Sequence, residues 1–166
     1  MANNIGTKFE IYVENLFRDL GKFRVKRNVN YQLQRRFTKK LVKIVQIDVQ
    51  FYDFFGKYIV ECKYLNNGNV GDDVVNKVKK NLEYLGLEKA IIATNQDFQM
   101  QAKRLAKKYG IKLYNKKILE KLDYERLSFI EMIAKKVKNR TLEEQVDKIK
   151  LENYSNKPIM QVKYVW

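Results

Sequence analysis

Two acidic residues and a lysine are spaced so that neighbouring strands could bring them together. Asp48 alternates with apolar residues in segment 45–51, and Glu61 and Lys63 alternate with apolar residues in segment 58–64. Side chains two residues apart on a strand point to the same face, so a hairpin of the two segments would make the three side chains converge. Two facing carboxylates are costly unless a cation lies between them. The spacing therefore predicts a site for a divalent cation.

The composition limits which ion and which chemistry this site could use. The chain has no histidine and one cysteine, Cys62, which excludes imidazole catalysis, a tetrahedral thiolate zinc site and an internal disulfide. Any metal must be a hard ion held by oxygen, and Mg²⁺ and Mn²⁺ are the candidates. Such an ion lowers the pKa of a bound water and neutralises charge on a phosphate, so the cluster suits phosphodiester hydrolysis. Lys63 could hold or deprotonate the water or stabilise the charge, and its role stays open.

The same residues also admit a structural interpretation. Acidic residues on hairpins often face solvent, and a Glu-Cys-Lys triplet occurs by chance in many chains. A site is favoured because the facing, the spacing and the patterns before and after these residues agree. Asp53 is a second candidate acid, but it falls at the turn between the two segments, so we prefer Asp48. Cys62 is expected on the opposite, apolar face with Val60 and Tyr64.

The charge balance indicates the kind of partner. The chain has 34 Lys and Arg against 19 Asp and Glu, a net charge of +15 and a pI near 9.7. A polyanion is the expected partner, with nucleic acid first and an anionic membrane surface second. Between Lys22 and Lys43 there are nine basic residues and no acidic one. The candidates for phosphate contact are Arg27, Arg35, Arg36, Lys39 and Lys40.

Other residues near this basic segment have two interpretations each. The segment itself could be a solvated, solubilising surface rather than a phosphate-binding one. Tyr31 and Phe37 within it could stack on bases or simply pack. Gln46 and Gln50 share the predicted face of Asp48, so they either contact DNA or line a polar cleft.

The length and the apolar content predict one compact domain. The chain has 166 residues and a mass of 19.9 kDa, with 45% apolar and 32% charged residues. No apolar run approaches the roughly 20 residues of a membrane span, and the start lacks the apolar region of a signal peptide. We expect a soluble, intracellular (cytoplasmic) protein. The lysine-rich composition with one cysteine would suit a thermophile or its virus, so the chain could be encoded by a virus or mobile element.

Alternating periods along the chain predict an α/β fold. Helical spacing marks segment 7–20, with Thr7 and Glu10 as a capping box and Gly21 as its stop. Strand patterns follow at 23–31, 45–51 and 58–64, the last two forming a hairpin. The later elements are helix 74–85 with Gly86 as its stop, strand 89–95, helix 98–109 with Gly110 as its stop, strand 111–114 and a helical stretch at 118–122. This order predicts a central mixed sheet flanked by helices, with the later strands parallel.

The C-terminal part reads as an extension of a core that spans residues 1–122. Residues 123–166 are mostly a charged helix with an apolar stripe from Leu127 to Val137 and a second helical stretch near Leu142 to Ile149. The tail from Pro158 alternates like an edge strand. These segments could cap the core or contact a second subunit.

The sequence resembles the PD-(D/E)xK nuclease superfamily, and within it the Mrr-like restriction endonucleases and archaeal Holliday junction resolvases. The family's first helix is similar to Gly6-Thr7-Lys8-Phe9-Glu10, and its catalytic pair resembles Ile47-Asp48 followed by Glu61-Cys62-Lys63. Its later half is similar to Ile91-Ile92-Ala93-Thr94-Asn95 and Gly110-Ile111. The resemblance covers roughly residues 5–122.

This resemblance implies a restriction-endonuclease-like core and a role for each residue of the motif. Asp48 and Glu61 would bind Mg²⁺ or Mn²⁺ together with the backbone carbonyl of Cys62, and Lys63 would be the catalytic lysine. Glu10 on the first helix would complete the acidic cluster, with Glu14 one turn later as its rival. The implied activity is a metal-dependent DNA endonuclease.

Several alternatives remain open from the sequence. The substrate could be ordinary duplex or branched DNA, and junction cutting would favour a homodimer through the C-terminal helices or the Trp166 tail. A catalytically inactive nucleic-acid-binding module of the same fold is the rival from a different class. A peripheral membrane protein is less favoured, because no sustained amphipathic basic helix with exposed aromatic residues is present.

Overall fold

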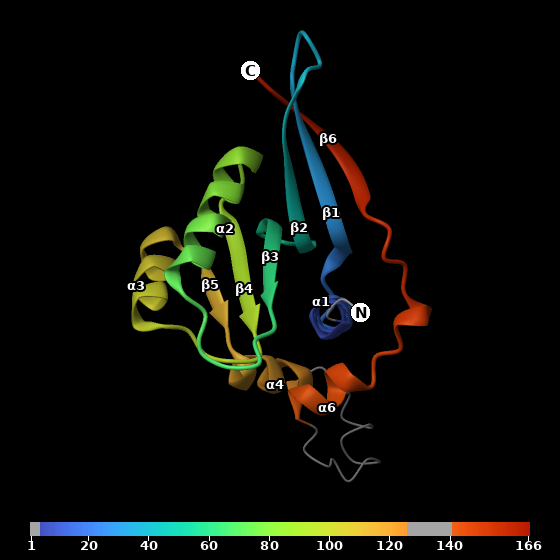
Figure 1. Cartoon of the computed structure of the whole chain (residues 1–166), viewed down its shortest axis with the longest axis vertical. Helices are drawn as coiled ribbons and strands as arrows, with labels where there is room; N and C mark the ends of the chain where they lie inside the picture. The colour runs from blue at the N-terminus through green and yellow to red at the C-terminus, as the bar shows by residue number, and fades with distance from the viewer. Residues whose placement is uncertain (1–3, 126–140) are drawn as a thin grey trace.

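The computed structural model describes residues 4–125 and 141–166 and forms a six-stranded sheet with helices on both faces (Figure 1). In chain order the elements are α1 (Asn4–Asp19), β1 (Phe23–Arg35), β2 (Leu41–Asp53), β3 (Gly56–Lys63), α2 (Asp72–Leu85), β4 (Lys89–Thr94), α3 (Met100–Tyr109), β5 (Lys112–Tyr114), α4 (Lys116–Glu125), α6 (Leu142–Asp147), the 3₁₀ turn η1 (Leu151–Asn153) and β6 (Ile159–Val165). The apolar stripe predicted from Leu127 to Val137 lies outside the described residues.

The sheet is mixed, as predicted. Its strand order is β5-β4-β3-β2-β1-β6, in which β1, β2 and β3 are successively antiparallel and β3, β4 and β5 are parallel. The predicted hairpin between the Asp48 and Glu61 segments is therefore confirmed as β2 and β3. The predicted edge strand is β6, which runs parallel to β1. A parallel ladder between β3, β4 and β5 requires the crossover helices α2 and α3 between them.

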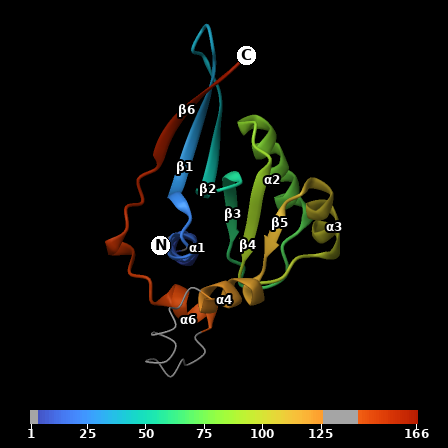
Figure 2. The same cartoon turned by 180° about the vertical axis from the view of Figure 1, so that it is seen from behind.

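Two apolar clusters hold the layers together. One lies under α2 and α3, where residues such as Val75, Val78 and Ala102 pack against Ile59 and Ile92. The other lies on the opposite face, between α1, α4, α6 and the sheet. Figures 1 and 2 show α2 and α3 on one side of the sheet and α1 on the other. Both faces of the parallel strands are thus buried, which explains the continuous apolar run of β4.

The alternation of β1 and β2 reverses where Asn28 lies opposite Asp48. Asn28 has a positive φ of 53°, a conformation that asparagine tolerates better than most residues. Before this point Arg27 faces α1, whereas Val29 after it packs in the cluster beneath α2. On β2, Ile47 and Val49 likewise belong to opposite clusters. Side chains that would share one face of a regular hairpin therefore point to different helical layers on the two sides of Asp48.

The basic segment between Lys22 and Lys43 lies on a long hairpin formed by β1 and β2. β1 continues to Arg35 and β2 begins at Leu41, so the prediction of strands at 23–31 and 45–51 was too short at this end. We call residues 29–47 the arm. Figure 1 shows it projecting beyond the other strands, with β6 alongside. One face of the arm is buried because Tyr31, Leu33 and Val45 pack in the cluster with α2.

The predicted start of the first helix and the predicted ends of two later helices have different outcomes. Helix α1 begins at Asn4, so Thr7 lies inside the helix and the capping-box interpretation of Thr7 and Glu10 is wrong. The side chain of Glu10 is consequently available for contacts outside its own helix. The predicted stops at Gly86 and Gly110 are confirmed, and both glycines adopt the left-handed conformation that ends α2 and α3.

The described C-terminal residues pack as part of the same body. Leu142 and Val146 of α6 are fully buried in the cluster with α1, and β6 extends the sheet along the arm. Among residues 4–125 and 141–166, no helix combines the length and apolar character needed to cross a bilayer.

Candidate active site

Strands β2 and β3 separate at the residues that were predicted to carry chemistry. Their ladder runs from Asp53 opposite Gly56 to Val49 opposite Val60. Beyond it the Asp48 carboxylate accepts a hydrogen bond of 2.8 Å from the backbone N–H of Cys62. A side chain thus replaces the strand pairing at this point. We call Asp48, Glu61, Cys62 and Lys63 the fork.

Glu61 is held at the fork by two lysines. Its side chain is buried, with 4% of the residue exposed. Lys63 Nζ lies 2.8 Å from Oε1, and Lys77 Nζ on α2 donates to Oε1 and Oε2 at 2.7 and 2.9 Å. The predicted convergence of Glu61 and Lys63 is observed. The two ammonium groups supply the counter-charge and the hydrogen-bond donors that a buried carboxylate needs.

Sequence reasoning missed Lys77. The only signal was its place in α2 beside the core-facing stripe, between the buried Val75 and Val78. Helical spacing shows that such a residue borders the buried face, but not which strand residue it meets. The contact with Glu61 spans two elements, so it depends on how α2 packs over β3.

The protonation states of Asp48 and Lys63 at the fork reflect burial and the nearby negative charges. Burial, with the charge of Glu61 as the second cause, raises the pKa of Asp48 to about 7 from an ordinary value of 3.8. Burial alone would lower the pKa of Lys63, but its hydrogen bond to Glu61 and the charges of Glu61 and Asp48 outweigh burial and leave it raised. Lys63 is therefore a cation and a hydrogen-bond donor in this arrangement. Asp48 is the group that changes protonation near neutral pH.

Glu10 and Glu14 are both tied to an arginine rather than to the fork. Arg27 is 7% exposed, and its guanidinium lies 3.6 Å from Glu10 and 3.3 Å from Glu14. Glu14 also pairs with Arg18 at 2.7 Å. Burial raises the pKa of Glu10 despite Arg27, and the nearby charges of Glu61 and Lys63 act on it too. Glu10 thus lies close enough to the fork to interact electrostatically with Glu61 and Lys63.

Two predicted DNA contacts are placed elsewhere. Arg27 donates to the backbone oxygen of Ser155 at 2.7 Å and faces α1, so it is not part of the exposed basic surface. Gln50 is buried and accepts a hydrogen bond from Tyr31. The reversal of the strand alternation at Asp48 explains both placements. Residues on the two sides of this point that would share a face in a regular strand face different helical layers. Gln46 is exposed, so it does not share the face of Gln50 as predicted.

The remaining candidates lie as follows. Arg35, Arg36, Lys39 and Lys40 are all exposed at the end of the arm. Asp53 is occupied at the β2–β3 turn, where it accepts from Phe55 N–H at 2.8 Å, so it does not compete with Asp48. Cys62 faces the apolar cluster as predicted, and burial raises the pKa of its thiol well above the ordinary value.

Comparison with known proteins gives the family of this chain. The family model Mrr_cat, described as restriction endonuclease, matches residues 2–122 and so includes the whole fork. The chain belongs to the Mrr_cat family. No curated protein matches the sequence.

Two solved structures share the fold of this Mrr_cat domain. The protein of unknown function AF1548 is 23% identical with a TM-score of 0.57, over 72% of this chain and 67% of that one. Protein VC1899 from Vibrio cholerae is 20% identical with a TM-score of 0.52, over 70% of this chain and 30% of that one. At these identities the likeness shows the fold alone.

The fork of this Mrr_cat domain has oxygen donors that fit a hard divalent cation. Asp48 and Glu61 are close enough for the charge of one to raise the pKa of the other, which is the repulsion that a cation would relieve. Among the described residues no three His, Cys, Asp or Glu side chains are grouped closely enough to hold an ion. Glu10 is thus not brought in as a third side-chain ligand. Backbone carbonyl or water oxygens would have to complete the coordination, as is usual for Mg²⁺.

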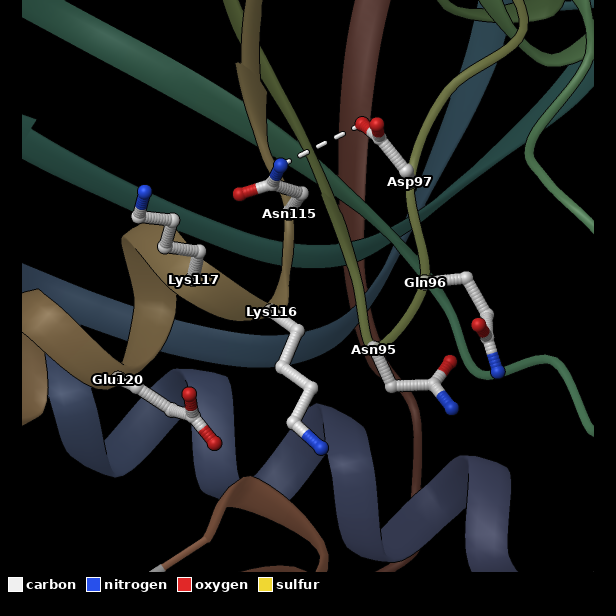
Figure 3. A pocket seen from close by; sticks show the side chains of 7 residues that line it. All are labelled: Asn95, Gln96, Asp97, Asn115, Lys116, Lys117 and Glu120. Atoms are coloured by element: carbon white, nitrogen blue, oxygen red, sulfur yellow. Dashed lines mark hydrogen bonds between the residues drawn. The ribbon is translucent and has the colours of Figure 1, made fainter.

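A polar pocket opens at the same edge of the sheet (Figure 3). It is lined by Asn95, Gln96, Asp97, Asn115, Lys116, Lys117 and Glu120. Asn95 directly follows Thr94, the partner of Lys63 in the β3–β4 ladder. Its amide bonds both the N–H and the C=O of Leu65, at 2.8 and 2.9 Å. Asn95 therefore positions the chain that leaves the fork after Lys63.

Proposed function

We propose that the protein is a metal-dependent endonuclease that hydrolyses phosphodiester bonds in DNA. The observation that carries this proposal is the fork itself. Two carboxylates that repel each other, the half-buried Asp48 and the buried Glu61, lie where β2 and β3 separate, with the ammonium of Lys63 2.8 Å from Glu61. Membership of a restriction endonuclease family supports it, because such enzymes generally use divalent metals. The net charge of +15 supports a nucleic-acid substrate.

Each residue of the fork has a proposed role. Asp48, Glu61 and the carbonyl of Cys62 would hold Mg²⁺ or Mn²⁺, which when bound would lower the pKa of a water and screen charge on the phosphate. The Asp48 carboxyl must lose its proton to bind the metal ion. Lys63, which stays protonated beside Glu61, stabilises negative charge on the phosphate oxygens. Glu10 adds negative charge at the margin of the site, restrained by Arg27.

A cleavage assay tests this proposal. Supercoiled plasmid, linear duplex, single strand and a four-way junction would be incubated with Mg²⁺ or Mn²⁺, with and without chelator. Removing Asp48 or Lys63 (Asp48→Ala, Lys63→Ala) should lower cleavage by roughly 10³-fold, the order expected for groups that stabilise transition-state charge. Preferred cutting of the junction would support a resolvase, and a homodimer would supply its two sites.

The matched control is the second acid that the sequence offered. Asp53 is engaged at the β2–β3 turn, away from the fork. Asp53→Asn should therefore cleave at the wild-type rate. Loss of cleavage in Asp53→Asn but not in Asp48→Ala would overturn the assignment. So would the absence of any cleavage while salt-sensitive DNA binding persists in every variant.

One observation favours the second candidate, a nucleic-acid-binding module without catalysis. Lys77 donates to both oxygens of Glu61, so this carboxylate already has a resident counter-charge. In a binding module neither the wild type nor Lys77→Ala would bind Mn²⁺ in calorimetry. In a nuclease the ion must displace Lys77, and Lys77→Ala should bind Mn²⁺ a few-fold more tightly, since it loses a competing charge.

A further inference from the structure

Two exposed aromatic side chains meet at the end of the arm. Phe37 in the β1–β2 turn is 85% exposed and Trp166 is 86% exposed, and their ring centroids are 6.2 Å apart. The guanidinium of Arg36 lies 4.2 Å from the centroid of the Trp166 ring. Strand β6 delivers Trp166 to this place, because Val165 is paired with Arg35 and accepts from Arg36 N–H at 3.0 Å. We call Phe37, Trp166 and Arg36 the tip (its neighbourhood is seen in Figure 1).

The charged side chains of the two segments that build the tip are all basic. Arg35, Lys39 and Lys40 are exposed beside it. The two segments that build it, residues 20–47 and 153–166, contain no Asp or Glu at all. A cluster of basic residues without counter-charge attracts phosphate and repels another copy of itself. The tip is therefore complementary to a polyanion and not to a second molecule of this chain.

The aromatic rings define which form of the polyanion fits. Regular duplex presents its phosphates outside and keeps its bases stacked within, so basic residues alone suffice to bind it. Unpaired nucleotides expose base faces, which stack on aromatic rings and on arginine planes. Two aromatic rings left in solvent amid basic side chains match the second form. We infer that the tip binds unpaired nucleotides of DNA by stacking them on Trp166 and Phe37.

This inference rests on the proposed nuclease and specifies its substrate. From Leu41 to Asp48 strand β2 advances by seven residue steps, which is roughly 23 Å at about 3.3 Å per residue. That length corresponds to about seven base pairs of duplex at about 3.4 Å each. DNA with a gap, flap or branch at about that distance from the cut bond would engage the fork and the tip together.

The sole tryptophan of the chain makes the tip directly observable. The sequence contains one Trp, so emission excited selectively from tryptophan reports on Trp166 alone. The full chain would be titrated in chelator, so that nothing is cut, with a single strand, a blunt duplex and a gapped duplex. We expect quenching by the single strand and the gapped duplex but not by the blunt duplex. Phe37→Ala should weaken binding of the single strand about tenfold and that of the blunt duplex less than twofold.

The controls separate stacking from charge and from the general presence of aromatic residues. Phe54 on the β2–β3 turn is 92% exposed, and Phe54→Ala should leave all three affinities unchanged. Absence of quenching at saturating single strand, or equal weakening of all three DNAs by Phe37→Ala, would overturn the inference. A Trp166 emission that shifts with protein concentration in the absence of DNA would also overturn it. Plasmid cleavage without quenching would reject the tip alone, whereas quenching without cleavage would support the tip and reject the nuclease.

Discussion

The fork and the arm use charge in contrasting ways. At the fork, Asp48 is half-buried and Glu61 is buried, and their carboxylates accept from specific donors at 2.7 to 2.9 Å. On the arm, the basic side chains extend into solvent from a hairpin without acidic residues. A charge in a poorly solvated site acts strongly on its neighbours, whereas exposed charges act additively through a screened field. Substitutions at the fork should therefore affect the cleavage step, whereas substitutions on the arm should affect the affinity for DNA in general.

Arg27 tests the boundary between these regions, with the largest expected effect on stability. It was predicted as a phosphate contact, yet it is buried against Glu10 and Glu14. Arg27→Ala would leave those carboxylates without their partner and should lower the free energy of unfolding by about 3 kcal/mol. Denaturant unfolding monitored by circular dichroism measures it. The exposed Arg35→Ala should leave stability unchanged and weaken DNA binding, and the opposite pattern would contradict this division.

Metal binding at the fork should depend on pH through Asp48. The pKa of this carboxyl in the metal-free fold is about 7, because of burial first and the charge of Glu61 second. Below that pH the ion must displace a proton, so its affinity should fall about tenfold per pH unit, and above it the affinity should be constant. Calorimetry of Mn²⁺ in buffers of different ionisation enthalpy would detect the released proton. Equal affinity on both sides of pH 7 would contradict the assignment.

The same shift makes a prediction for stability in chelator. A pKa raised from 3.8 to about 7 means that ionisation of Asp48 disfavours the fold, so its contribution to stability is lost as pH rises between these values. Asp48→Asn removes that charge and keeps an acceptor for the Cys62 N–H. Its melting temperature should therefore exceed that of the wild type by a few degrees above pH 7 and match it near pH 4. A lower melting temperature above pH 7 would contradict the account.

The arm should produce the smallest and least selective effect. Lys39 and Lys40 are exposed and flank the turn. If each neutralises one phosphate, the double substitution to alanine should reduce the slope of log affinity against log salt by about two for duplex DNA. Cleavage at saturating DNA should be unchanged. A loss of cleavage at saturation would mean that the arm takes part in catalysis, which would end the distinction from the fork.

Much of the fold could be predicted because each helix and strand has its own spacing of apolar residues along the sequence. The switch from alternating to helical spacing located β2, β3, α2, β4 and α3, and the glycines after α2 and α3 marked their ends. Strand ends were less predictable on the arm, where exposed Val42 and Ile44 replace the alternation. At residues 41–44 the strand continues because backbone hydrogen bonds to β1 support it, not because alternate side chains of these four residues are buried.

Within the site, the sequence by itself determined the types and spacing of the chemistry-bearing residues. The sequence alone shows Asp48, Glu61 and Lys63, the absence of histidine and the basic segment without acidic residues. Only the tertiary structure decided which charges are paired. A single left-handed residue, Asn28, accompanies the reversal that separates Gln46 from Gln50 and buries Arg27. Periodicity describes neighbours along one element, whereas the contacts of Lys77 with Glu61 and of Trp166 with Arg36 join elements distant in the chain and exist only after packing.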